Sequence, residues 1–327
     1  MPTTITTTDI VTEYGKYYEQ AGQNLARLKR SLTQPTVTLE KYGTHIRTND
    51  TIYRMANFIG QPLLQPYQHN FTPNGGVEFI PNQINLRQMK VDVSLAPDSI
   101  EESWLGFLAG RNSKSLRDWP IVRWMLEEYI AKQIQEDLEL NAVYKGVYNA
   151  SGTTPSTTMD GLKKQLIDGV ANTDYPINKV TGIGALTEAT IFDQIEAFDE
   201  AIPSLYVGRP VVIFVSPKWA RYYKKNKRTN NFYVVENAAD IDATVDFTNH
   251  VVAGLPSMAE TDDMFATLKT NILHLTKRSL SSVNVKVQEI HRDVDILIDM
   301  WQAVGFGCNK EVWVTAETVT TSTPTEP

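Results

Sequence analysis

Apolar side chains recur at helical spacing near the start of the chain. The pattern begins near Asp9 and stops before Pro35, and polar residues occupy the opposite face. Its members are Ile10, Val11, Tyr14, Tyr18, Ala21, Leu25 and Leu28. This predicts an amphipathic N-terminal arm, and packing onto its own chain or a neighbouring copy is favoured over binding to lipid.

A longer helical pattern runs from about Asp118 to Asn149, which corresponds to about 30 residues or roughly 45 Å of helix. Asp118 can cap its start with Pro120 in the first turn, and Gly152 and Pro155 follow its end. A coiled coil is the alternative, but a strict 3.5-residue spacing is not kept. A single helix lying across a sheet is therefore favoured. Its apolar side is formed by Val122, Leu126, Ile130, Ile134 and Leu138.

Between these helices the period changes to two, which is typical of strands. A turn at Asn74, Gly75 and Gly76 precedes the alternating residues Val77 and Phe79. The apolar positions are then even-numbered, at Ile84 and Leu86, and afterwards odd-numbered, at Met89, Val91, Val93 and Leu95. One inserted residue, a bulge, would explain the shift.

An extended segment 77–95 would reach roughly 60 Å, which is longer than one strand of a compact domain needs. Much of it is therefore expected to project. Because an isolated hairpin is only marginally stable in water, the projecting part must lie on another surface, most economically that of a second copy. Deleting residues 57–90 should then give a folded subunit that cannot assemble.

The second half of the chain reads as mixed α/β structure. A helix is predicted over 187–201, and the continuous apolar run at 211–215 predicts a buried strand that leads into a helix at Pro217. Further strands are expected within 264–275. Alternating residues from Val283 onward predict a hairpin around His291 and Arg292, and a final strand follows at 311–316. These terminal strands are expected to pack together against the long helix.

The composition of the chain argues against several classes of function. The 327 residues carry a net charge of −7, whereas a dedicated DNA-binding protein usually has a basic excess. The single cysteine, Cys308, excludes a disulfide framework within one chain and favours a reducing compartment. The sequence has no long apolar run and no signal-like start, so neither a membrane span nor export is expected. The polar tail 318–327 is expected to be flexible.

Candidate catalytic chemistry is sparse. The histidines never occur at the spacing of a helical zinc pair, and no catalytic residue or cofactor is predicted. Asp293, Asp295 and Asp299 lie on one face of a predicted strand and could bind a hard cation, which would suit a metal-dependent hydrolase. A solvated strand face is the favoured interpretation.

A basic cluster near the middle of the chain is the main candidate contact patch. It is flanked by Tyr222, Tyr223, Phe232 and Tyr233, so it could bind phosphates and stack on bases. Cations that offset a helix C-terminus or meet an acidic neighbour are the favoured alternative. The cluster consists of Lys224, Lys225, Lys227 and Arg228.

The order of these elements resembles the major capsid proteins of tailed bacteriophages, which have the HK97-like α+β fold. The resemblance covers nearly the whole chain and is carried by the N-terminal arm, VEFIPNQINLRQMKVDVSLAP, the helix ending YKGVYNASG, VVIFVSPKWARYYKKN and RDVDILIDMWQAVGFGCNKEVWVTAE. It implies an N-terminal arm (1–48), an E-loop β-hairpin (49–97), a P-domain with the spine helix (98–152), an inserted α/β A-domain (153–282), returning P-domain strands (283–317) and a tail (318–327).

The resemblance further implies a structural protein without enzymatic activity. Such a subunit forms the pentamers and hexamers of an icosahedral head and encloses double-stranded DNA without tight sequence-specific binding. Assembly in the bacterial cytoplasm, a location in the virion, and portal and decoration proteins as partners would follow. Because fewer than about 50 residues precede the E-loop, a separate scaffolding protein is expected. An encapsulin-type nanocompartment shell is the alternative on the same fold.

Overall fold

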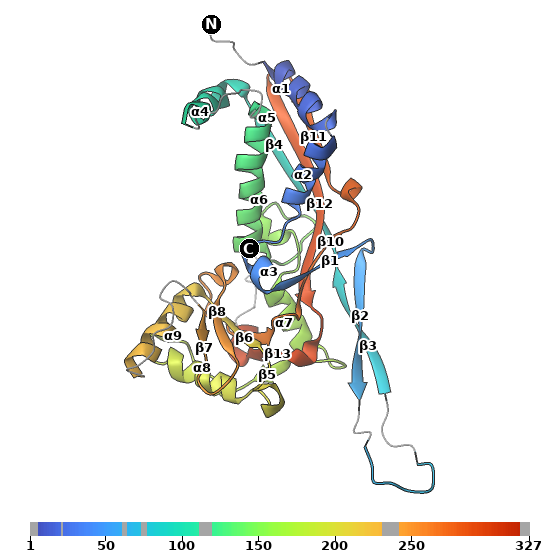
Figure 1. Ribbon diagram of the computed structural model, residues 1–327, viewed down its shortest axis with the longest axis vertical. Coiled ribbons are helices and arrows are strands. Elements are labelled where there is room, and N and C mark those ends of the chain that lie inside the picture. Colours follow the sequence, from blue (N-terminus) through green and yellow to red (C-terminus); the bar gives the residue numbers. More distant parts are fainter. Residues whose placement is uncertain are drawn as a thin grey trace.

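The computed structural model describes residues 6–20, 22–60, 64–72, 77–110, 120–230 and 242–320. These residues form an elongated molecule (Figure 1), in which the N-terminal helices lie at one end and a long β-hairpin projects at the other. The predictions for Asn74, Gly75, Gly76, Asp118 and the aromatic residues 232–233 lie outside the described residues, as does 321–327 of the predicted tail.

A five-stranded sheet forms the long axis of the molecule. Its central strand is β12 (Asp293–Phe306), which runs antiparallel to β10 (Ile272–Lys277), β11 (Asn284–Ile290) and β4 (Arg87–Leu95). Strand β1 (Gly43–Thr48) joins β10 in parallel. The predicted hairpin around His291 is confirmed, because β11 and β12 pair directly on either side of it.

The predicted long helix is observed as one helical stretch over 121–142, along one side of this sheet (Figure 1). It comprises α5 (Ile121–Arg123), α6 (Ala131–Asp137) and the π-helical turns Trp124–Ile130 and Leu138–Ala142. The apolar side is buried as predicted, at Val122, Leu126, Ile130, Ile134 and Leu138.

Both ends of this helix differ from the prediction. Pro120 precedes the first helical residue rather than lying in the first turn. The helix ends at Ala142 instead of Asn149, because the chain turns sharply at Gly146 and pairs with the segment that follows. A Cβ atom at Gly146 would lie 2.5 Å from the carbonyl oxygen of Ala142 and 2.6 Å from that of Met159, so only glycine fits this close backbone approach.

The N-terminal arm packs onto its own chain. Helices α1 (Thr7–Tyr14) and α2 (Gly22–Leu32) are joined by a π-helical turn at Gly15–Glu19, and Tyr14 donates a 2.9 Å hydrogen bond to the carbonyl of Val285. The carboxylate of Glu127 on the long helix lies 2.8 Å from Arg27 of α2. The expected packing on protein is therefore confirmed within one subunit. Helix α3 (Val37–Tyr42) then leads into β1.

A second, six-stranded sheet lies beside the lower half of the first. Its order is β5 (Asn178–Val180), β13 (Val312–Thr315), β9 (Phe265–Leu268), β6 (Val211–Val215), β8 (Val251–Gly254) and β7 (Ala243–Thr244). Helices α8 (Ile191–Glu200) and α9 (Pro217–Asn230) share its apolar core, whereas α7 (Leu162–Ala171) contacts β12 of the first sheet. The predicted buried strand and its following helix are confirmed as β6 and α9, and the predicted helix over 187–201 is α8.

Two strands lie in the opposite sheet from the one predicted. Strand β10 belongs to the five-stranded sheet rather than to the inserted region, and β13 belongs to the six-stranded sheet rather than to the terminal group. The chain crosses between the sheets at the tight turn from Leu268 to Asn271. Because β9, β10 and β13 are all short and largely buried, their apolar pattern carries no information about which sheet each strand joins.

Helices α3, α7, α4 (Pro97–Gly110) and α10 (Ala316–Thr320) were not predicted from the sequence. The prediction of a flexible tail from residue 318 is wrong for 318–320, because these residues belong to α10 and Thr318 is buried against Met264. Among the described residues, none of the helices combines the length and the apolar character that crossing a membrane requires.

Candidate assembly surfaces

The most conspicuous surface is the projecting hairpin. Strands β2 (Ile52–Gly60) and β3 (Val77–Asn85) pair antiparallel along their whole length and extend away from the body (Figure 1). Beyond them, the described segment 64–72 carries three almost fully exposed apolar side chains, Leu64 at 98%, Tyr67 at 92% and Phe71 at 94%. Phe79 on β3 is also exposed. Such side chains are normally buried, so this part of the molecule lacks the packing that a finished core provides.

The base of the hairpin is anchored firmly. Ile84 and Leu86 are buried in a small core with Leu273, Leu275 and Ala303 of the five-stranded sheet. The side-chain amide of Asn82 donates a 2.7 Å hydrogen bond to the carbonyl of Phe306. The direction in which the hairpin projects is therefore fixed by packing at its base.

The prediction that much of 77–95 projects is confirmed only for the first part of this segment. The shift from even to odd apolar positions marks the junction at Leu86 between β3 and β4, not a bulge in one strand. Strand β4 pairs with β12 from Leu95 to Arg87 and is part of the five-stranded sheet. Val77 to Pro81 project as expected and Asn82 to Asn85 form the anchored base of the hairpin. Arg87 to Leu95 do not project, because β12 offers β4 a continuous row of backbone partners.

A groove of about 780 Å³ lies between β4, the C-terminal half of the long helix and the segment 148–158. Lys90 and Asp92 at this groove form an exposed ion pair with a 2.6 Å separation. The apolar lining residues are Met89, Val91, Ile134, Leu138 and Met300, of which Val91 is partly exposed and the other four are buried. The accessible residues of the groove are therefore mainly polar, with Val91 contributing an apolar side chain.

The predicted basic cluster is divided by the structure. Lys227 is 2% exposed, donates a 2.5 Å hydrogen bond to the carbonyl of Thr244 and lies 3.0 Å from the carboxylate of Asp246. It is therefore not part of an exposed patch, and the alternative of an acidic partner holds for this lysine. Lys225 and Arg228 are exposed on α9, and Lys224 is half-buried there. Tyr223 is buried against Phe192, so it cannot stack on a base.

The three aspartates of β12 alternate with buried residues as predicted. Asp299 lies opposite Lys90 of β4, and Asp295 lies opposite Ser94. Within the described ranges, no group of three or more histidine, cysteine or carboxylate side chains could hold a metal ion. Asp293, Asp295 and Asp299 thus do not converge on a cation site there.

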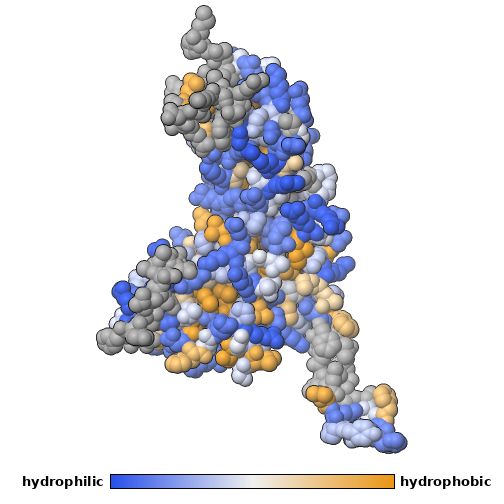
Figure 2. All heavy atoms as spheres, viewed as in Figure 1, coloured by the Kyte–Doolittle hydropathy of each residue, from blue (hydrophilic) through white to orange (hydrophobic). Residues whose placement is uncertain are grey.

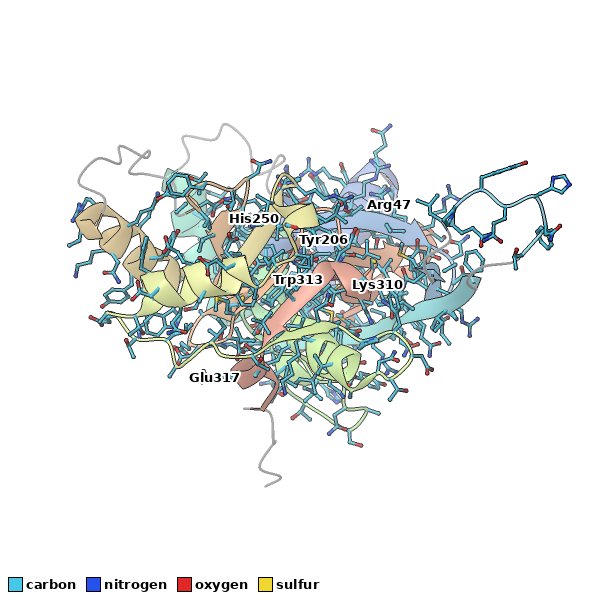
Figure 3. All side chains as sticks on the ribbon, turned by 90° about the horizontal axis from the view of Figure 1, so that it is seen from below. Arg47, Tyr206, His250, Lys310, Trp313 and Glu317 are labelled. Atoms are coloured by element: carbon cyan, nitrogen blue, oxygen red, sulfur yellow. The ribbon has the colours of Figure 1, made fainter. Side chains whose placement is uncertain are left out.

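One buried histidine was not singled out by its sequence position. His250 is fully buried, and its Nδ1 lies 2.5 Å from a carboxylate oxygen of Asp199 while its Nε2 lies 2.9 Å from the carbonyl oxygen of Tyr206 (Figure 3). Burial alone would lower the pKa of His250, but these two acceptors raise it above the ordinary value. Since both ring nitrogens face acceptors, the imidazolium form is the one that fits.

A pair of adjacent histidines in the five-stranded sheet favours the neutral form instead. The Nδ1 atoms of His45 and His274 lie 3.1 Å apart across β1 and β10. Burial, together with the neighbouring His45, lowers the pKa of His274 to about 4. This pair is therefore neutral near pH 7.

The fold of this chain is similar to that of solved capsid structures. No protein-family model and no curated protein matches the sequence. Among solved structures, the satellite phage P4 procapsid including the size-determination (Sid) protein aligns with a TM-score of 0.55 at 12% identity, over 93% of this chain and 95% of that chain. The capsid of an empty GTA particle aligns with a TM-score of 0.55 at 10% identity, over 86% and 90%. The native GTA capsid gives a TM-score of 0.52 at 10% identity over the same shares.

These alignments establish the fold. They span 86–93% of this chain and 90–95% of the matched chains, so the likeness is not limited to one common motif. The chain therefore has the mixed α+β fold of these phage and GTA capsid structures.

Proposed function

We propose that this chain is the major capsid protein of a tailed bacteriophage, with the HK97-like organisation and no enzymatic activity. The observation that carries the proposal is the combination of a capsid-like fold over 93% of the chain with a projecting segment on which Leu64, Tyr67 and Phe71 are almost fully exposed. A subunit that must be completed by other copies accounts for both features.

The parts of an HK97-like subunit can be assigned on this basis. The hairpin β2–β3 with residues 64–72 is the E-loop, and the helix over 121–142 is the spine helix of the P-domain. The five-stranded sheet belongs to the P-domain. The six-stranded sheet with α8 and α9 is the A-domain, and α1 and α2 form the N-terminal arm.

The E-loop of one subunit is proposed to lie on its neighbour. Leu64, Tyr67 and Phe71 supply apolar area that is stabilising only when covered, and each aromatic ring can bury roughly 150–250 Å². The groove beside the spine helix is the proposed receiving surface, with Val91 as its partly exposed apolar residue and Met89 and Leu138 buried beneath it. Pairing the two surfaces would build pentamers and hexamers of an icosahedral head.

The electrostatic properties suit a container for double-stranded DNA. A net charge of −7 gives no general attraction for phosphates, so the enclosed DNA is free to enter and leave. Burial of Lys227 removes one cation from the candidate basic patch, which leaves Lys225 and Arg228 as its exposed members. A separate scaffolding protein, a portal and decoration proteins are the proposed partners, and the virion is the proposed location.

Negative-stain electron microscopy tests this function directly. The full chain is expressed alone and together with its genomic neighbours, and the soluble fraction is separated by sedimentation. We expect closed shells, or rings of five and six subunits, in at least one of these samples. Monomers in every sample would contradict the proposal. Shells that hold a cargo enzyme in place of DNA would instead support a nanocompartment.

A further inference from the structure

An aromatic residue with an unusual backbone lies at the edge of the six-stranded sheet. Phe247 has a φ of 63°, in the left-handed region that residues with a Cβ rarely adopt. Its side chain is also fully exposed, at 105% of the reference area. Both the backbone and the uncovered ring are unfavourable in the isolated subunit, and full exposure means that packing does not offset them.

The turn that carries Phe247 is held rigidly. Its residue Asn249 donates a 3.1 Å backbone hydrogen bond to the carbonyl of Val207, and the amide of Val245 donates a 2.9 Å bond to the carbonyl of His250. Figure 3 shows His250 beside Tyr206, where the ring nitrogen meets the Tyr206 carbonyl at 2.9 Å. These hydrogen bonds therefore fix the position of Phe247 in the fold.

The neighbouring loop adds further apolar surface. Leu205 is 72% exposed and Val207 is 38% exposed, and these residues flank the Tyr206 carbonyl to which His250 is bonded. Apolar surface is visible over the lower part of the body in Figure 2, where the six-stranded sheet and its helices lie. We refer to Phe247, Leu205 and Val207 together as the Phe247 patch.

The size of this patch restricts its partner. Three side chains offer at most a few hundred Å², with roughly 150–250 Å² from the aromatic ring, whereas a stable complex buries roughly 800 Å² on each partner. The patch cannot hold an independent protein by itself. It can be covered only by something that another interface already keeps in place, and neighbouring subunits joined by their E-loops meet this condition.

We infer that the Phe247 patch is a contact between neighbouring copies of this chain, a conclusion that rests on the proposed capsid function. The strained turn of Phe247 is then retained because the ring is covered in the assembled shell. In the free subunit the patch stays exposed, since it is too small to drive association without the E-loop.

The substitution Phe247→Gly is expected to change the stability of the free subunit and its assembly in different ways. Glycine removes the ring and also relieves the left-handed backbone. We expect the thermal midpoint of the unassembled subunit to stay equal or rise by up to about 2 °C, while the fraction that sediments as shells falls at least about fivefold. Phe247→Leu keeps an apolar side chain and should retain assembly within about twofold of wild type.

Two matched controls are available in the same chain. Glu260 and His291 also have left-handed backbones, with φ values of 65° and 58°, and both are exposed. Glu260→Gly and His291→Gly should relieve strain without changing the yield of shells.

The possible outcomes distinguish this inference from the proposed function. Wild-type chains that form no shells contradict both, whereas normal shells from Phe247→Gly overturn the patch alone. If Phe247→Gly lowers the thermal midpoint, Leu205→Ser on the neighbouring loop decides. A reduced yield of shells from a stable Leu205→Ser subunit supports the contact, and an unchanged yield overturns it.

Discussion

The atoms around two buried histidines shift their pKa values in opposite directions. His250 faces a carboxylate and a carbonyl, which can only accept hydrogen bonds. His274 instead donates from Nε2 to Gln302, whose amide nitrogen points to the carbonyl of Leu32. The Nδ1 atom of His274 must then accept from His45. A further proton on His274 would meet the N–H of His45.

Acid is therefore expected to weaken the fold at His274. Its pKa is lowered from 6.5 to about 4, so the unfolded chain binds this proton first as the pH falls. The contribution is fully present above pH 6.5 and is lost progressively down to about pH 4, by up to about 3 kcal/mol. Urea unfolding between pH 7 and 4.5 should show this slope, and His274→Gln should remove it.

The comparison has a simple control. His69 is exposed in the described part of the projecting loop, so His69→Gln should follow the wild-type curve. Parallel pH curves for wild type and His274→Gln would contradict the assignment of the slope to this residue.

Lys227 offers a second test at the residue scale. Lys227→Met removes the ion pair to Asp246 and the hydrogen bond to Thr244 within a buried environment. Leaving these acceptors without their cation should lower the free energy of unfolding by about 2 kcal/mol. Lys225→Met, two residues earlier on the exposed side of α9, should change the free energy of unfolding by less than about 0.5 kcal/mol. Equal effects in denaturant unfolding would show that the lysines are equivalent.

At the scale of elements, the junction at Leu86 separates two different roles. Before it, β3 pairs only with β2, and after it, β4 is bound to the central strand β12. The two strands are continuous in sequence, yet one belongs to the projecting hairpin and the other to the core sheet. Any deletion that tests the hairpin must therefore end before this junction.

The sharpest deletion removes residues 57–80 and joins Ala56 to Pro81 through an Asn-Gly turn. These two residues face each other across β2 and β3, so a two-residue turn can close the shortened hairpin. Because Ile84 and Leu86 keep their core, the thermal midpoint should change by only a few °C. Shell formation should be lost.

The longer deletion of 57–90 provides the contrast. It also removes the residues of β4 that pair with Asp299 to Gln302, so it should impair folding itself. Circular dichroism and sedimentation of both variants distinguish the two effects. Normal shells from the shorter deletion would show that the hairpin is dispensable for assembly.

At the scale of the whole molecule, the proposed capsid requires many copies of an acidic chain to come together. Each subunit carries a net charge of −7, so neighbouring copies repel one another over roughly 30 Å at 0.01 M salt and over roughly 8 Å at 0.15 M. Apolar contacts such as those of the E-loop are less affected by salt in this range. Assembly should therefore be favoured as the ionic strength rises.

Light scattering of purified subunits checks this expectation. The extent of assembly should increase severalfold between about 10 and 150 mM NaCl, and KCl should give the same result because the effect is one of screening. A decrease with salt would mean that complementary charges, not apolar contacts, dominate the interfaces.

The sequence allowed much of this architecture to be predicted. The long helix, the buried strand β6 and the β11–β12 hairpin were found from periodicity because each is amphipathic or wholly apolar over its length. The helix end at Ala142 was missed, since the apolar spacing continues to Tyr144 while the backbone turns at Gly146. The burial of Lys227 was missed because Asp246 is distant in sequence and meets it only in the fold.

By itself, the sequence determined the type and apolar face of the strongly periodic segments, such as the long helix, β6 and the β11–β12 hairpin, because these properties depend on neighbours within a few residues. Only the tertiary structure decided that β10 and β13 exchange sheets, that β4 is held by β12 and that the pKa of His250 is raised while that of His274 is lowered. These features arise from backbone pairing and buried polar contacts between distant segments, which the local pattern of apolar and polar residues does not encode.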